Sequence, residues 1–62
     1  MDDYSVRYLH HTDEAILIDD DGYEIWLPIS QIEHQEDLDM LDRYEWITIM
    51  VPDWLAEEKE MV

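Results

Sequence analysis

The sequence of 62 residues contains no cysteine, one glycine and only three basic residues. Without cysteine there is no disulfide and no thiolate ligand or nucleophile, and a reducing compartment is expected. The single glycine, Gly22, excludes the glycine-rich loops that hold nucleotide phosphates. The apolar runs are far shorter than the roughly 20 residues of a membrane-spanning helix. The N-terminal segment is not basic and apolar, so a secretory signal is not expected.

Acidic residues, in contrast, are abundant. The chain has 18 Asp and Glu against three Lys and Arg, and its formal net charge is −15. Duplex DNA carries one charge per roughly 1.7 Å, so this charge equals that of roughly 25 Å of duplex. A folded chain of this length has a radius of gyration of roughly 11 Å, hence a diameter near the same length. The charge disfavours direct binding of nucleic acid or membrane and favours a basic protein partner.

Residues 1–62 are predicted to form a single domain of the α+β class, mainly β. Hydrophobic residues make up 47% of the chain, which is enough for folding. Alternating apolar and polar residues predict strands at 4–11, 23–27 and 44–51. The segment 14–18 is rich in β-forming residues and apolar on both faces, which predicts a central strand. The four short antiparallel strands would form a curved sheet or small open barrel. In the first strand, Tyr8 and His10 are expected on the same face. Asp21-Gly22 predicts a tight hairpin between the second and third strands.

Helical segments are predicted before and after the fourth strand. Ser30 and Glu33 match the Ser-x-x-Glu capping box, which predicts a short turn capped by Ser30. Leu38 and Leu41 are three residues apart and predict one helical turn over an edge of the core. A C-terminal helix is expected from Asp53 to about residue 60, because proline suits the first turn and an acidic residue suits the positive end of the helix dipole. Trp54 and Leu55 are its expected anchors on the sheet.

Metal binding and catalysis find little support in the sequence. The run Asp19–Asp21 before Gly22 fails as an EF-hand loop, because Leu17 and Pro28 occupy ligand positions, and it is interpreted as a solvated hairpin tip. His10 and His11 are adjacent on a strand and point to opposite faces, so with His34 they form a poor zinc site. Carboxylate pairs occur everywhere, and a small core leaves little room for a catalytic pocket. We expect no cofactor, no metal and no enzymatic activity.

The three tryptophans have two interpretations. Trp26, Trp46 and Trp54 are most simply residues of the core or its rim. Alternatively, tryptophan and tyrosine are common in binding hot spots, and exposure of Tyr23 or Trp46 would indicate a homodimer or a partner surface.

The acidic residues are clustered along the chain, and the clusters are the predicted partner-binding site. The main patch is the segment from 33 to 45, and the hairpin tip is the second. The predicted binding residues are Asp19, Asp20, Asp21, Glu24, Glu33, Glu36, Asp37, Asp39, Asp42 and Glu45.

Two segments resemble a family of small acidic phage- and prophage-encoded proteins. The first reads Gly-Tyr-Glu-Ile-Trp-Leu-Pro over 22–28 and continues with Ser-Gln-Ile over 30–32, and the second reads Val-Pro-x-Trp-Leu-Ala-Glu-Glu-Lys over 51–59. Ile29 stands where the family usually has a basic residue. The resemblance implies a β-rich fold, a mobile-element origin, location in the cytoplasm of a bacterial host and, by association, a counter-defence role similar to that of anti-CRISPR proteins.

Two hypotheses follow from charge and resemblance together. The first is a non-enzymatic phage inhibitor of a host CRISPR effector or restriction enzyme. It would present carboxylates, in place of phosphates, to the basic groove of a nucleic-acid-binding protein. The alternative is a small structural or accessory phage protein that acts through self-association or other protein contacts, with incidental acidity.

Overall fold

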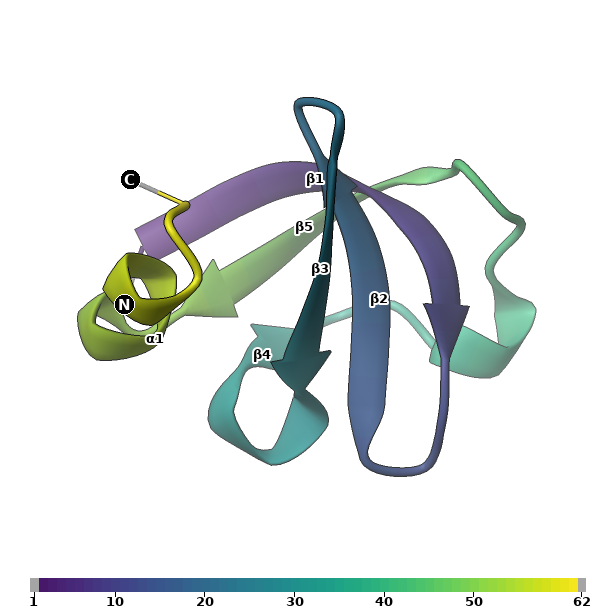
Figure 1. Cartoon of the computed structure of the whole chain (residues 1–62). Coiled ribbons are helices and arrows are strands. Elements are labelled where there is room, and N and C mark those ends of the chain that lie inside the picture. Colours follow the sequence, from purple (N-terminus) through teal and green to yellow (C-terminus); the bar gives the residue numbers. More distant parts are fainter. Residues whose placement is uncertain (1, 62) are drawn as a thin grey trace.

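The computed structural model describes residues 2–61 and contains five antiparallel strands, two 3₁₀ turns and one α-helix (Figure 1). The strands form one sheet in the order β3-β2-β1-β5-β4. The elements in chain order are β1 (Asp2–His11), β2 (Ala15–Asp20), β3 (Tyr23–Pro28), η1 (Ile29–Gln31), β4 (Glu33–His34), η2 (Leu38–Met40), β5 (Trp46–Val51) and α1 (Asp53–Glu58). The mainly β prediction is confirmed, but the number of strands is five instead of four. The additional strand, β4, has only two residues, too few for alternation to be recognised.

β1 is the longest strand and links the two halves of the sheet. Its N-terminal half pairs with β5 and its C-terminal half pairs with β2. The register with β2 slips between Tyr8 and His10, so that Leu9 forms a β-bulge. A bulge bends the strand and changes the faces of the residues that follow it. His11 therefore joins Tyr8 on the inner face and His10 faces outward, which corrects the prediction that Tyr8 and His10 share a face.

The hairpin between β2 and β3 has the predicted tight turn. Asp21 and Gly22 have positive φ angles of 53° and 91°, as the two central residues of a type I′ turn require. The Gly22 N–H donates to Asp19 Oδ1 at 2.9 Å, and Asp20 pairs with Tyr23 across the turn. The tip projects at the top of Figure 1.

The core lies on the inner face of the bent sheet. β2, β3 and β5 each contribute alternate aliphatic residues, as the sequence predicts for β3 and β5. The largest fully buried side chains are Val6, Ile16, Ile18, Leu27, Ile49, Val51 and Leu55. Among residues 2–61 no polar or charged residue is buried. Folding therefore depends on apolar burial, and the charge lies outside it.

Helix α1 covers one part of this core, and of its two predicted anchors Leu55 is confirmed and Trp54 is not. Leu55 and Ala56 are buried, whereas Trp54 is 55% exposed. A helix of this length presents one side to the sheet, and Trp54 lies on the other side. The helix ends at Glu58 because Glu60 takes a left-handed conformation with φ 58°. The Met61 N–H then donates to the Ala56 carbonyl at 2.8 Å, as in a Schellman-type ending.

The segment between β3 and β5 contains both short turns. η1 has Pro28 as its N-terminal flank, without a side-chain cap, so the predicted cap by Ser30 is wrong. The chain returns to an extended conformation at the buried Ile32, and this places Glu33 in β4 instead of in a helical turn. The prediction for η2 is confirmed, since Leu38 is buried and Leu41 packs against the core.

Candidate functional site

Acidic side chains lie over the whole outside of the domain. Of the 18, 15 are exposed and the other three, Asp19, Asp20 and Glu36, are half-buried. The domain measures 28 × 24 × 17 Å and has a radius of gyration of 10.4 Å. Within residues 2–61 the only contact that could form an ion pair joins His11 to Asp39, and it is one only when His11 is protonated. The net negative charge is therefore almost entirely open to solvent or to a partner.

Four of the predicted binding residues come together at the tip of the β2–β3 hairpin. Asp19 lies directly opposite Glu24, and Asp20 and Asp21 continue to the turn. Like charges in opposite positions of a sheet destabilise it. The tip is thus an exposed loop on which negative charge is concentrated against its own repulsion.

The predicted residues of the segment 33–45 divide into two groups. Glu33 and Glu36 line a groove beside β5, whereas the other four lie on the connection from the start of η2 to β5, at the right of Figure 1. Two of those four also order the connection. Asp37 Oδ1 accepts from the Asp39 N–H at 3.1 Å, and Glu45 Oε1 accepts from the Asp42 N–H at 3.3 Å.

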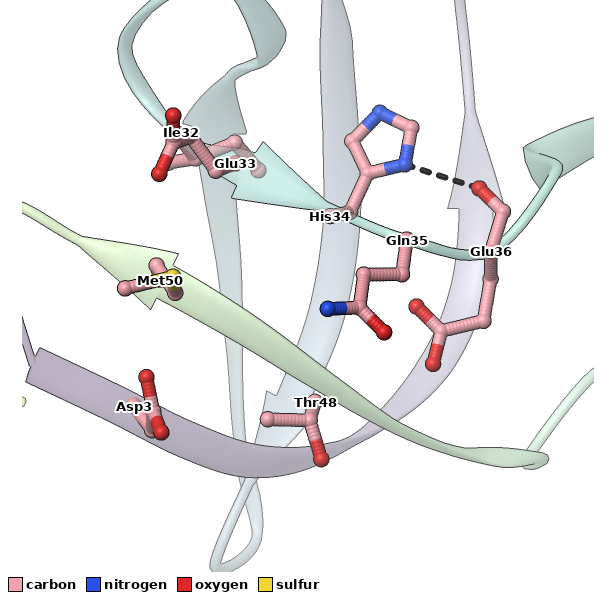
Figure 2. Close-up of a pocket in the computed structure, with 8 residues that line it drawn as sticks. All are labelled: Asp3, Ile32, Glu33, His34, Gln35, Glu36, Thr48 and Met50. Atoms are coloured by element: carbon pink, nitrogen blue, oxygen red, sulfur yellow. Dashed lines mark hydrogen bonds between the residues drawn. The ribbon is translucent and has the colours of Figure 1, made fainter.

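The groove lies on the outer face of the sheet, between β5 and the segment that begins with β4. We call it the β5 groove. Its main part has a volume of about 690 Å³ and is lined by eight residues, shown in Figure 2. A smaller hollow of about 370 Å³ shares Glu36 and Thr48 with it and reaches Trp46. A core this small was expected to leave little room for a pocket, and the groove indeed lies outside the core, on the surface of the sheet.

The register of β1 and β5 explains why the surface is hollowed beside β5. Three outward-facing pairs follow one another along β1 and β5: Asp3 with Met50, Ser5 with Thr48, and Arg7 with Trp46. Ser5 and Thr48 are small and stand between larger side chains, so the surface is depressed between them. This signal was present in the sequence, but it becomes readable only when the register of the two strands is known.

One wall of the β5 groove is fixed by His34. His34 Nδ1 lies 2.8 Å from the Glu36 backbone carbonyl oxygen. A carbonyl oxygen can only accept, so Nδ1 carries the proton and donates it. This bond bends the chain after β4, and the Gln35 and Glu36 side chains extend from the bend toward β5 (Figure 2).

Glu36 has an unusual environment in this wall. Its Oε2 is the only buried side-chain oxygen or nitrogen of the described part of the chain that lacks a hydrogen-bond partner. Leaving a buried acceptor unpaired is costly, and more so for a carboxylate than for a neutral group. In the sequence Glu36 is one acidic residue among many, and nothing in its neighbourhood along the chain indicates this environment.

The outer face also carries exposed aromatic side chains. Trp26 and Trp46 are 45% and 60% exposed there, so neither tryptophan lies in the core. Tyr23 is 73% exposed at the start of β3, on the same side of the strand as Ile25 and Leu27. Both strand tryptophans occupy outward positions of the alternation. Trp26 meets His10 edge-on, with 6.4 Å between ring centroids, and the Arg7 guanidinium lies over the Trp46 ring.

A hydrogen-bonded chain on the inner side connects β1 to η2. Tyr8 Oη lies 2.6 Å from His11 Nδ1, and His11 Nε2 lies 3.1 Å from Asp39 Oδ1. The Asp39 carboxylate can only accept, so His11 Nε2 carries a proton and donates to it. When His11 is neutral, its Nδ1 is then an acceptor, and the Tyr8 hydroxyl donates to it. Burial, and secondly the charge of Asp39, raise the pKa of Tyr8 above its ordinary value of 10.0.

The remaining predictions concern metals, membranes and relatives. In the described range 2–61 no group of three or more His, Asp or Glu side chains is arranged to hold a metal ion. No helix in that range is long and apolar enough to cross a membrane. No protein-family model, no curated protein and no solved structure matches the chain. The resemblance to phage proteins therefore stays a prediction.

Proposed function

We propose that this protein binds the basic groove of a nucleic-acid-binding protein and blocks it, with its carboxylates in place of phosphates. The observation that carries this proposal is the match of charge to size. A duplex as long as the 28 Å dimension of the domain would carry about 16 phosphate charges, and the domain carries a net charge of −15. Arginine and lysine side chains that hold phosphates pair equally well with carboxylates.

The position of the carboxylates supports binding over catalysis. The charged side chains lie outside the core, where they are free to pair with a partner. The one hydrogen-bonded Tyr–His–Asp chain has a tyrosine whose raised pKa makes it a weaker acid and a poorer nucleophile at neutral pH. Exposed Trp26, Trp46 and Tyr23 would supply the apolar contacts that interfaces require.

The resemblance to phage proteins adds a class of target to this proposal. A bacterial CRISPR effector or restriction enzyme has the required basic groove and would be a natural target of a phage inhibitor. The alternative, a phage accessory protein that associates with itself, is favoured by the same exposed aromatic residues. The two differ in solution: the inhibitor is a monomer that binds a basic protein, and the accessory protein is an oligomer on its own.

Displacement of nucleic acid tests the proposal. A panel of purified CRISPR effectors and restriction enzymes, each bound to fluorescent duplex DNA, is titrated with this protein while anisotropy is measured. We expect release of DNA from at least one member, with the effect falling steeply between about 50 and about 200 mM salt. Binding that leaves the DNA in place, or no binding to any member, would contradict the mechanism.

A further inference from the structure

Strand β3 leaves one edge of the sheet open. It is the last strand at its end of the sheet, and among the described residues only β2 pairs with it (Figure 1). We propose that an extended basic segment of the partner pairs with this edge as an additional antiparallel strand, with arginine side chains on the outer face. This inference rests on the proposed binding of a basic protein and assigns a backbone contact within it.

The register of the β2–β3 hairpin determines which backbone groups of β3 are free. In an antiparallel pair of strands, hydrogen-bonded and non-hydrogen-bonded residue pairs alternate. Tyr23 closes the two-residue turn, and at the other end the Ile29 N–H donates to the Glu14 carbonyl at 2.9 Å. Odd-numbered residues of β3 therefore bond to β2, and the N–H and C=O groups of Glu24 and Trp26 point to the open side. Within residues 2–61 no backbone group outside β2 bonds to either residue.

The edge of β3 lacks the usual protection against pairing. Natural sheets protect their edges with very short strands, lysine, proline or bulges. The opposite edge follows this rule, because β4 has only two residues. β3 has six residues, no lysine and an unbroken register with β2. Its one proline, Pro28, is its last residue, so the groups of Glu24 and Trp26 stay available for strand addition.

The core side of the sheet is also incomplete at this edge. Tyr23 and Ile25 face inward, yet Tyr23 is exposed and Ile25 is only partly buried. On β2, one strand further in, Ile16 and Ile18 are fully buried. An additional strand would place one residue opposite Ile25 in a non-hydrogen-bonded pair, where side chains lie closest. An apolar residue at that position would extend the core.

The side chains on the outer face select a basic strand. Asp19 lies opposite Glu24 on one side and opposite Arg7 on the other. The Arg7 guanidinium lies over the Trp46 ring instead, and within residues 2–61 it forms no ion pair. The two opposed carboxylates therefore repel each other without a cation between them. Arginines two residues apart on the added strand would face Glu24 and Trp26, pairing with the carboxylate and stacking on the ring.

A second copy of the chain is a poorer occupant of this edge. Its β3 would bring another Glu24 and another acidic hairpin tip, and each copy carries a net charge of −15. Repulsion between the copies opposes their pairing, whereas a basic segment is attracted.

Peptides that differ only in the position of N-methyl groups test pairing through the backbone. The probe is acetyl-Thr-Arg-Val-Arg-Thr-amide, whose two arginine N–H groups face β3 when the valine lies opposite Ile25. The ¹⁵N-labelled full chain is titrated with this peptide, and we expect saturable amide shifts centred on Glu24 and Trp26. N-methylation of both arginines should weaken binding at least about tenfold. N-methylation of the valine and the last threonine, whose N–H groups face away, should change it less than about twofold.

Two changes of charge test the choice of a basic strand. Replacement of both arginines by citrulline keeps the shape and the backbone donors and should weaken binding at least about tenfold. E24Q should weaken binding of the arginine peptide at least about threefold. E57Q removes one charge from α1 and should leave the affinity unchanged. E24Q also relieves the repulsion with Asp19, so its loss of binding would not reflect unfolding.

Any of four results would overturn this inference. They are equal affinity of the two N-methylated peptides, full affinity of the citrulline peptide or of E24Q, shifts spread evenly over the acidic surface, and a dimer of the free protein with β3 at its interface. Failure of strand pairing would leave DNA displacement by the carboxylates intact, and failure of DNA displacement would leave the peptide result standing. The two proposals therefore fail separately.

Discussion

Arg7 and Trp46 lie opposite each other on β1 and β5, and the Arg7 Cζ is 4.4 Å from the centroid of the Trp46 ring. Arg7 Nη1 also donates to the Tyr44 carbonyl oxygen at 3.1 Å. Tyr44 has a positive φ of 70°, so the same guanidinium holds the strained turn that leads into β5. One of the few basic side chains thus has a structural role on the outer face.

Replacing Arg7 tests this role. R7A should lower the free energy of unfolding by about 1 kcal/mol through loss of the cation–π contact, together with the bond to Tyr44. R7K retains the charge but not the planar stacking and should recover only part of the loss. Urea denaturation of the three proteins measures both effects. Equal stability of R7A and wild type would show that the contact contributes nothing.

Leu27 and Trp26 are neighbours on β3 that face opposite sides of the sheet. L27A should cost about 2–5 kcal/mol because Leu27 is fully buried, and in so small a domain this can abolish folding. W26A should cost about 1 kcal/mol or less, since the ring is exposed at the surface. Circular dichroism with thermal melting compares them. A larger loss in W26A would show that the faces of β3 are reversed.

Asp21 and Asp53 give a pair of single-charge changes with opposite expected signs. D21N places Asn-Gly at a type I′ turn and relieves repulsion at the hairpin tip, so it should raise the melting temperature. D53N removes an acidic residue from the first turn of α1 and should lower stability by about 0.5 kcal/mol. Differential scanning calorimetry of both variants measures the difference. If D21N melts below the wild type, the Asp21 carboxylate makes a stabilising contact at the tip.

Tyr8 makes stability depend on alkaline pH. Its pKa is raised in the folded state, so its contribution is complete below about pH 10, the ordinary pKa of tyrosine, and is lost as the pH rises through the folded-state value. Y8F removes this contribution and the bond to His11. Guanidinium denaturation at about pH 8 and about pH 11 should show a smaller loss for Y8F than for the wild type. Equal losses would mean that Tyr8 does not cause the dependence.

Glu36 should lower the stability of the fold through its unpaired oxygen. E36L removes the unpaired buried oxygen and should raise the free energy of unfolding by about 1 kcal/mol. E33L, at the exposed rim, is the control for removal of one charge. A destabilised E36L would show that the carboxylate has a partner in the folded chain after all.

The sequence allowed the parts of the fold that depend on local pattern to be predicted. Alternation in β3 and β5, the turn at Asp21-Gly22 and the start of α1 at Asp53 all follow from side-chain period, turn chemistry or capping. The bulge at Leu9 could not be predicted, because it depends on how β1 divides its pairing between two neighbours. Its effect on His10 and His11 was missed for that reason.

The candidate site was predictable only in part. Charge predicted where carboxylates are abundant, but the β5 groove depends on the pairing of Ser5 with Thr48 and on the bend fixed by His34. The first is a contact between distant segments, and the second forms just after a strand of only two residues, which has no recognisable sequence pattern. The exposure of Trp54 was missed because a short helix gives too little periodicity to distinguish its two sides.

The central claim is that exposed carboxylates replace phosphates in a basic groove, and DNA displacement by two matched variants tests it most directly. D21N/E24Q/D42N removes three charges from the predicted binding residues, and E57Q/E58Q/E60Q removes three from the C-terminal end, so both have the same net charge. We expect the first variant to displace DNA from its target at least about tenfold more weakly than the wild type, and the second within about twofold. Displacement by both variants at wild-type strength would contradict the claim.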